Sequence, residues 1–393
     1  MHRVHYDSDY ITLLSDSEIL QPIKVLEQTF RRYRSPEHTS NQLYEILIAS
    51  ARGAYWKKSA SPLILYKTYK QIVRLIEAAW LIDKNKENYG FVSQEHRTEI
   101  PQNESDNNDI SAQTQFSRAI LVIAKIFRRH SMCYLKGAIY DFLFLAMEPT
   151  YTDHLDPEYQ DISIFESINQ LILGLFEFYE FYPRKKTSTF NRSKWKEHLE
   201  QHRTRETLYD YVYSLEDYFY LTSKEDLLSG IRSARKILCS EGYWKSHENP
   251  ADIIYLFYEY LFMIEQFWRI WLGALDANID LSSPWRFSKK ILKTLKSADQ
   301  MKLIYAWDFL KKRFARRDIL YWCRLWDDCL QTLLSNRSSP ARKNGRYHRI
   351  LEFIEGLVHL SELESFMSWE YPYLDEDKVP MESRLETRTH PNN

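Results

Sequence analysis

The sequence predicts an all-α fold, either a multi-helix bundle or an irregular helical array. Apolar residues recur at spacings of three and four along most of the chain, as they do on one face of an α-helix. The 393 residues include only nine Gly, although Gly supplies the turns of β-hairpins and the loops that bind nucleotide phosphates. We find no convincing alternating stretch of strand length bounded by turn residues.

Cap residues indicate where individual helices begin. Ser15 and Glu18 have the spacing of a capping box, in which each side chain bonds the backbone of the other. Thr222 and Glu225 indicate another start. At three further sites a cap residue precedes Pro, which suits the first turn of a helix because its missing N–H would be unpaired there; these sites are Ser61-Pro62, Asn249-Pro250 and Ser283-Pro284.

Two of these starts open long amphipathic runs. Pro62 is followed by a single apolar face that comprises Tyr66, Tyr69, Val73, Ile76 and Trp80. Pro250 precedes the most apolar run of the chain, 253–275, which is long enough to cross a bilayer but contains Glu259, Glu265 and Arg269. Because these charges are costly in lipid, we predict a helix buried in a soluble core, with its Glu residues paired to Arg or Tyr. The Phe- and Tyr-rich run 171–181 also has helical spacing.

A polar stretch divides the predicted helices into two groups. Residues 84–115 contain few large apolar side chains and many Asn, Glu, Gln and Ser. Such a stretch buries too little surface to offset the entropy of ordering. We therefore predict an N-terminal helical group, a flexible linker, a main helical domain and a frayed tail, over 1–83, 84–115, 116–371 and 372–393.

The composition also excludes several kinds of site. The Gly-rich dinucleotide and P-loop patterns are absent, as is the G-x-S-x-G pattern of hydrolases. The four Cys form no C-x-x-C pair, and His198 and His202 lack the accompanying ligands of a zinc site. We expect no cofactor and no metal. The polar N-terminus has no secretory signal, so we expect a cytoplasmic protein.

The largest departure from the average composition is a basic region between Pro284 and Arg349. It contains 17 Lys or Arg and five Asp or Glu, in a chain with a formal net charge of −1. A local excess of this size indicates a polyanionic partner, or an acidic surface elsewhere on the same molecule.

Helical stepping separates this region into apolar and cationic faces. Phe287, Ile291 and Leu295 fall on one apolar side, and a second helix has a stripe of Leu303, Trp307, Leu310 and Phe314. A third helix over 318–334 adds Arg324, and a loop over 336–349 adds further cations. The candidate nucleic-acid contacts are Arg286, Lys289, Lys293, Lys296, Lys312, Arg313, Arg316, Arg342, Lys343 and Arg346.

Three alternatives explain the same charges without nucleic acid. The cations could form an ordinary solvated helix face. The segment 351–386, which has ten acidic and two basic residues, could dock on them. Basic amphipathic helices with Trp also suit an anionic membrane surface, although no lipidation motif supports that role.

The leading functional hypothesis is a non-enzymatic intracellular module that binds RNA or DNA through residues 284–349. Rows of cations can follow a phosphate backbone, and the interleaved aromatic side chains can stack on bases. The alternative is a helical scaffold or regulator that binds another protein through aromatic-rich surfaces. A further alternative is a HEPN-like ribonuclease, which uses an Arg and a His a few residues apart, as in Arg342 and His348. Beyond this pair we assign no catalytic residue, and we expect no small-molecule site.

Overall fold

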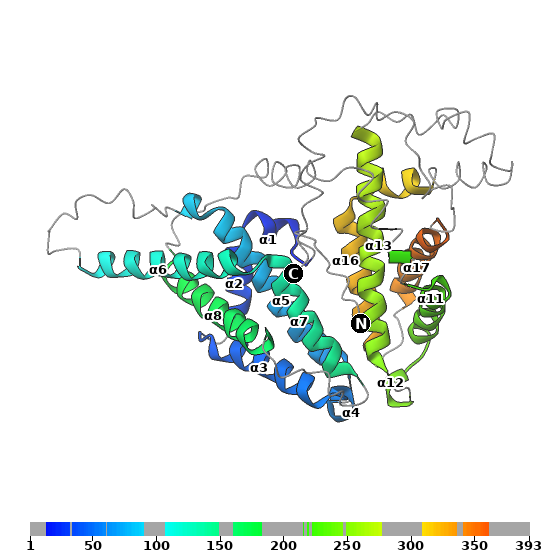
Figure 1. Ribbon diagram of the computed structural model, residues 1–393, viewed down its shortest axis with the longest axis horizontal. Coiled ribbons are helices and arrows are strands. Elements are labelled where there is room, and N and C mark those ends of the chain that lie inside the picture. The colour runs from blue at the N-terminus through cyan, green and yellow to red at the C-terminus, as the bar shows by residue number, and fades with distance from the viewer. Residues whose placement is uncertain are drawn as a thin grey trace, which may run out of the picture. The chain divides into compact units, whose positions relative to one another are not determined.

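The protein is all-helical in the residues that the computed structural model describes (Figure 1). These are residues 13–31, 34–59, 61–89, 107–148, 160–182, 215, 218–219, 222–246, 249–276, 309–335 and 341–360. Over these ranges the structure has 13 α-helices, one 3-10 helix and no strand, which confirms the predicted fold class. None of the described helices is both long enough and apolar enough to cross a membrane.

Contacts divide the chain into two compact units. Unit 1 consists of Met1–Glu206, Ser229–Phe262 and Leu320–Leu351, and unit 2 of Thr207–Leu228, Met263–Ile319 and Glu352–Asn393. In chain order the elements are α1 (Asp16–Leu20), α2 (Ile23–Phe30), α3 (Glu37–Arg52), α4 (Tyr55–Ser59), α5 (Leu63–Lys84), η1 (Lys86–Tyr89), α6 (Asn107–Arg129), α7 (Met132–Met147), α8 (Gln160–Phe181), α11 (Lys224–Leu238), α12 (Tyr243–Ser246), α13 (Pro250–Asp276), α16 (Ile319–Leu333) and α17 (Ala341–Leu360).

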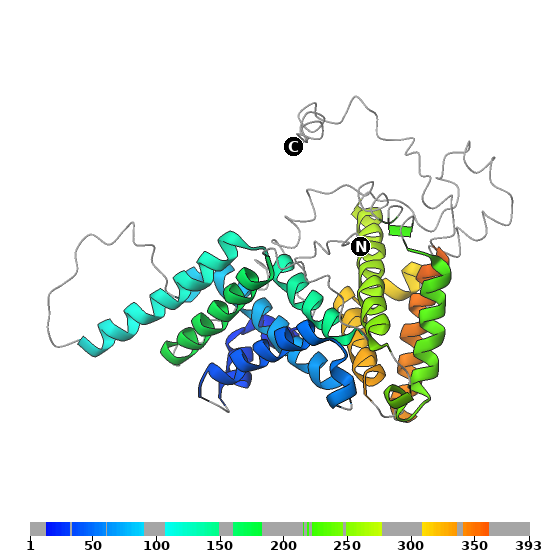
Figure 2. The ribbon, with the colours of Figure 1, turned by 60° about the horizontal axis from the view of Figure 1, so that its bottom comes forward.

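Helix α5 lies at the centre of the N-terminal helices of unit 1. It contacts α2, α3, α6, α7 and α8, while α3 packs along α7 and α6 packs along α8 (Figures 1 and 2). The apolar face predicted for α5 is buried at each of its positions, Tyr66, Tyr69, Val73, Ile76 and Trp80. The periodicity of this segment therefore identified the core face correctly.

Several helix starts coincide with predicted cap signals. The capping box at Ser15 is present, and the carboxylate of Glu18 accepts a hydrogen bond from the Ser15 N–H at 2.8 Å. Helix α13 begins at Pro250, where Asn249 Oδ1 accepts from the next N–H at 3.1 Å. At α11 the cap is the hydroxyl of Ser223, which accepts from the Asp226 N–H at 3.4 Å, one residue later than the predicted Thr222. Ser283-Pro284 lies outside the described residues.

Helix α13 confirms the prediction of a buried helix. Glu265 is 2% exposed and pairs with Arg269, one helical turn later, at 2.5 Å. Glu259 is also buried, and it lies close enough to Tyr260 to affect that hydroxyl. Burial, and then the negative charge of Glu259, raise the pKa of Tyr260 far above its usual value. Both glutamates of this helix thus belong to the core.

The aromatic residues of the described ranges mainly fill the core. Six of the described Trp are buried and Trp268 is half-buried. Among the described Phe, Tyr and Trp, only Tyr44 and Tyr255 are exposed. Because the rings are used for packing, the described part of the chain offers little support for an aromatic-rich binding surface.

Helix α17 corrects one sequence-based expectation. Residues 341–349 are its first turns, whereas a loop was predicted there. The physical reason is a buried stripe at helical spacing that holds the rest of the helix against the core, with Tyr347, Ile350, Leu351 and Ile354. The segment's many cations and single Gly obscured this stripe.

Parts of the predicted domain organisation remain predictions. Residues 90–106 and 361–393, which include most of the predicted linker and the whole predicted tail, lie outside the described residues. Two helical elements begin within the range predicted as a linker, η1 at Lys86 and α6 at Asn107.

Candidate polyanion interface

The structure describes four of the ten predicted nucleic-acid contacts. Lys312, Arg313 and Arg316 belong to unit 2, and Arg346 belongs to the part of α17 in unit 1. Arg342 and Lys343 form part of the α17 backbone, but their side chains are outside the described set. Also outside the described residues are Arg286, Lys289, Lys293 and Lys296.

In unit 2, residues 309–314 form a helical turn that is anchored by apolar side chains. Leu310 and Phe314 are buried, which confirms the described half of the predicted stripe. The ring of Phe314 meets Trp268 at 5.1 Å and Phe353 at 5.6 Å, both in edge-on geometry. Leu303 and Trp307, the other half of the stripe, lie outside the described residues.

A glycine on α17 allows this turn to pack closely. Phe309 stacks on Phe353 with ring centroids 5.9 Å apart. A Cβ atom at Gly356 would lie 2.3 Å from the Cζ of Phe309, so any larger residue would force the ring to move. The turn is therefore held in place by three aromatic contacts and one close backbone approach.

The opposite side of the turn carries a group of cations, which we call the cationic turn: Lys311, Lys312, Arg313 and Arg316. Lys311, Lys312 and Arg316 are exposed, and Arg313 is half-buried with its guanidinium 5.3 Å from the centre of the Phe309 ring. Within the described residues these four side chains form no ion pair. Such a turn can place several positive charges against a phosphate chain.

Helix α17 carries a second, separate group of exposed polar side chains in unit 1. Arg346 and Arg349 are exposed and lie three residues apart, on one side of the helix. His348 is also exposed, but its position six residues after Arg342 places it on a different side of α17. The spacing predicted for a nuclease pair therefore does not bring these residues to one helix face.

Arg324 corrects another expectation, because it does not belong to a cationic surface. Its guanidinium donates to the Leu14 carbonyl at 2.6 Å and to the Asp16 carboxylate at 3.0 Å. It therefore stabilises the packing of α16 against the segment that begins α1. Because the two partners lie far from Arg324 in the chain, local sequence patterns could not predict this contact.

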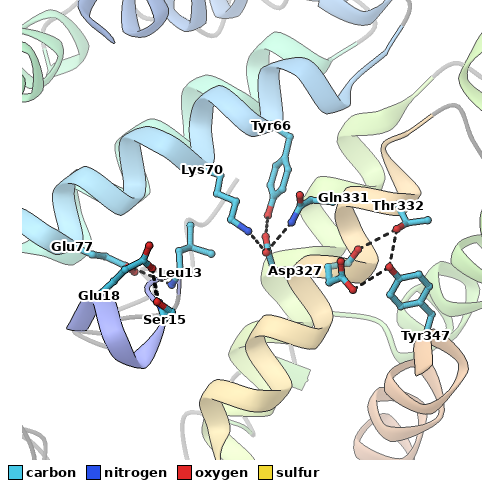
Figure 3. A network of polar contacts seen from close by, with 11 residues as sticks. Leu13, Ser15, Glu18, Tyr66, Lys70, Glu77, Asp327, Gln331, Thr332 and Tyr347 are labelled. Carbon is cyan, nitrogen blue, oxygen red and sulfur yellow. Dashed lines mark hydrogen bonds and ion pairs between the residues drawn. The ribbon is translucent and has the colours of Figure 1, made fainter. Parts of the chain in front are cut away.

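A buried polar network in unit 1 is the other chemically notable feature (Figure 3). Asp327 on α16 is 5% exposed and accepts hydrogen bonds from Tyr66 at 2.6 Å, from Lys70 and from Gln331 at 3.0 Å. Burial, followed by the charge of Asp327 and its hydrogen bond, raises the pKa of the Tyr66 hydroxyl well above its usual range. Nearby, the hydroxyl of Tyr347 bonds Thr332 and donates to Asp328.

A second part of the network surrounds Glu77 on α5, which is fully buried (Figure 3). Its carboxylate accepts from Lys136 at 2.9 Å and from the Leu13 N–H at 3.1 Å. Neighbouring Glu18 would have its pKa raised by burial. Hydrogen bonds from Ser15 and the charge of Arg74 outweigh that effect and lower it.

These carboxylates have structural partners rather than an open site. The carboxylates of Asp327, Glu77 and Glu18 each accept from two or more donors, as buried charges require. Over the part of the chain that the structure describes, no group of three His, Cys, Asp or Glu residues is arranged to hold a metal ion. We therefore assign the network to packing of α5 against α1, α7 and α16.

Sequence reasoning missed one set of exposed cations. Arg118, Lys125, Arg128 and Arg129 lie on the exposed side of α6. The signal was present in the sequence, because residues 110–129 contain no Asp or Glu and place these cations at helical spacing.

The chain matches no protein-family model, no curated protein and no solved structure.

Proposed function

We propose that this protein binds nucleic acid, RNA or DNA, through its phosphate backbone, and that the cationic turn is part of the contact surface. The observation that supports this most is the combination of exposed charge and fixed backbone. Three exposed cations and one Arg over an aromatic ring lie within six residues, while Leu310 and Phe314 hold the turn in a hydrophobic core. Preorganised charges bind better than mobile ones because less conformational entropy is lost on binding.

The chemistry of the turn suits phosphate more than base edges. Lys311, Lys312 and Arg316 can each neutralise one phosphate and release the counterions condensed on it, which is favourable at low salt. Arg313, held over Phe309, presents a planar group of donors that matches phosphate oxygens. Phosphate contacts position a protein on nucleic acid without distinguishing sequences, so we propose binding with little sequence preference.

The proposal also includes the other predicted contacts. Arg286, Lys289, Lys293 and Lys296 precede the cationic turn in the chain and share its helical spacing of cations in the sequence. Arg342, Lys343 and Arg346 follow it on α17. Their participation is part of the proposal. It is tested by charge reversal to Glu, applied separately to the residues before the cationic turn and to those on α17.

A charge-reversal experiment tests the proposal. The triple variant Lys311→Glu, Lys312→Glu, Arg316→Glu is compared with wild type for binding a fluorescent single-stranded RNA by anisotropy. A matched control reverses three exposed cations elsewhere, Arg52→Glu, Lys67→Glu and Arg232→Glu, with the same change in net charge. We expect the first variant to lose at least about tenfold in affinity and the control to lose much less.

Two results would contradict the proposal. Equal losses in the two triple variants would mean that only the net charge matters. Tight binding that the reversal at 311, 312 and 316 leaves unchanged would exclude the cationic turn from the interface. Circular dichroism of each variant checks that helical content is retained, so a loss of binding is not a loss of fold.

A further inference from the structure

Helices α6 and α8 form a closely packed antiparallel pair in unit 1 (Figures 1 and 2). Phe116 in the first half of α6 packs on Phe178 near the end of α8, with ring centroids 5.0 Å apart. At the other end, His130 Nε2 lies 3.3 Å from the hydroxyl of Ser167. Between them, Gly174 lets the backbones approach, since a Cβ there would lie 3.1 Å from Val122. These contacts fix which residues of the two helices lie at the same level.

The two helices carry opposite charge. Residues 110–129 of α6 contain four Lys or Arg and no Asp or Glu, whereas α8 contains four Asp or Glu and no Lys or Arg. The exposed positions follow helical stripes. Arg118, Lys125, Arg128 and Arg129 are exposed on α6; Glu166 and Glu180 are exposed and Glu177 half-buried on α8.

The charged stripes do not neutralise each other within one molecule. Although α6 and α8 are neighbours, none of these seven side chains forms an ion pair with a described residue. Each stripe also contains one exposed leucine, Leu121 on α6 and Leu173 on α8, with exposed fractions of 39% and 41%. They are two of the five large apolar residues exposed in the described ranges.

A polyanion fits this face poorly, because a phosphate chain lying along α6 would be repelled by the carboxylates of α8 beside it. We infer instead that the face binds a second copy of the chain and forms a two-fold symmetric homodimer. A basic ridge next to an acidic ridge is self-complementary, which is the property that an isologous interface requires. Complementary charges also favour this pairing over contact with unrelated surfaces.

The direction of the symmetry axis follows from the charges. With the two-fold axis parallel to the helices, α6 of one copy lies opposite α8 of the other, and basic meets acidic on both sides. An axis perpendicular to the helices in the same plane would place α6 against α6 and bring like charges together. The parallel axis also keeps each residue at its own level along the helices.

The level of each residue along the helices determines which residues of the two copies face each other. Within one molecule Val122 lies beside Gly174, so Leu121 is close in level to Leu173. Across the dimer these two leucines would therefore face each other. Arg118 is near the level of Glu177, and Arg128 is near that of Glu166. Each symmetric half of the predicted interface thus has a leucine contact at its centre with an ion pair on each side.

Complementary charge reversal provides the test. The first variant is Arg118→Glu with Arg128→Glu, and the second is Glu166→Arg with Glu177→Arg. We expect sedimentation equilibrium to show a dimer for wild type and at least a tenfold weaker dimer for each variant alone. Mixing the two variants should restore dimerisation, because both ridges of the mixed pair are again complementary. The control Lys67→Glu with Arg232→Glu should dimerise as wild type does.

Cysteine crosslinking tests the leucine contact directly. Leu121→Cys and Leu173→Cys are placed in separate chains in which the exposed Cys239 is replaced by Ser. We expect mild oxidation of the mixture to give a crosslinked dimer that contains both chains, and much less product from either chain alone. A wild-type protein that stays monomeric at high concentration would overturn the inference, as would a dimer that neither charge reversal weakens. The inference would also be overturned if wild type were monomeric and the variant Arg118→Glu with Arg128→Glu bound RNA more weakly. That result would assign α6 to nucleic-acid binding.

Discussion

Replacing Asp327 with Ala is expected to lower the free energy of unfolding by about 2–5 kcal/mol. The substitution leaves the hydroxyl of Tyr66, which is 1% exposed, without its acceptor, at a cost of about 1–3 kcal/mol. Lys70 is 24% exposed at its side chain and regains hydration, so its lost ion pair contributes about 1 kcal/mol or less. The hydrogen bond from Gln331 and the lost packing account for about 1 kcal/mol more.

A double-mutant cycle measured by urea unfolding checks this reasoning. Tyr66→Phe removes the donor but leaves Asp327 with Lys70 and Gln331, so it should cost only about 1 kcal/mol. Adding Asp327→Ala to Tyr66→Phe should then cost less than the same change in wild type, with a coupling energy of about 0.5–3 kcal/mol. The account of the network would be refuted if Asp327→Ala cost under about 1 kcal/mol, or if the two substitutions were additive.

Other outcomes follow from the same contacts. The free energy of unfolding should fall above about pH 10, because burial raises the pKa of Tyr66 and Tyr260 only in the folded state. The expected loss is up to about 1.4 kcal/mol per pH unit for each tyrosine. Urea unfolding that gives the same free energy throughout the alkaline range would contradict this. Glu18→Gln should lower the free energy of unfolding by about 1 kcal/mol at neutral pH and by less in acid. The lowered pKa of Glu18 stabilises the fold above the usual carboxyl range, and this contribution is lost as pH falls. Thermal melts of both proteins at two pH values compare the losses. Gly356→Ala should cost about 1–3 kcal/mol by displacing Phe309, and anisotropy should show weaker RNA binding, although less so than after charge reversal. An alanine there that left both stability and binding unchanged would mean that Phe309 does not position the cationic turn.

Local patterns predicted several of the helices, because capping and burial depend on neighbouring residues. The face of α5, the start of α13 at Pro250 and the helical state of 171–181 all followed from spacing and cap chemistry. The start of α17 did not, since its cations and Gly345 resembled a loop while the buried stripe begins only at Tyr347. Helix starts that depend on tertiary packing carry a weak local signal.

The partners of charged residues could not be predicted in the same way. Tyr66 and Asp327 are 261 positions apart, and Arg324 bonds Leu14 across 310 positions. Only folding brings such residues together, so the sequence could not reveal that Arg324 is already occupied. The cations of the 311–316 segment were predicted correctly as exposed at Lys312 and Arg316, because helical stepping places them away from Leu310 and Phe314.

The salt dependence of RNA binding tests the proposed function most directly. In the variant Lys311→Gln, Lys312→Gln, Arg316→Gln, three cations are neutralised without adding repulsion. If each contacts one phosphate of a single strand, the slope of log affinity against log salt should become shallower by about 2 relative to wild type. A steep wild-type slope that this variant reduces by that amount is the result we predict. Identical slopes for the two proteins would show that these side chains contact no phosphate, and would contradict the proposal.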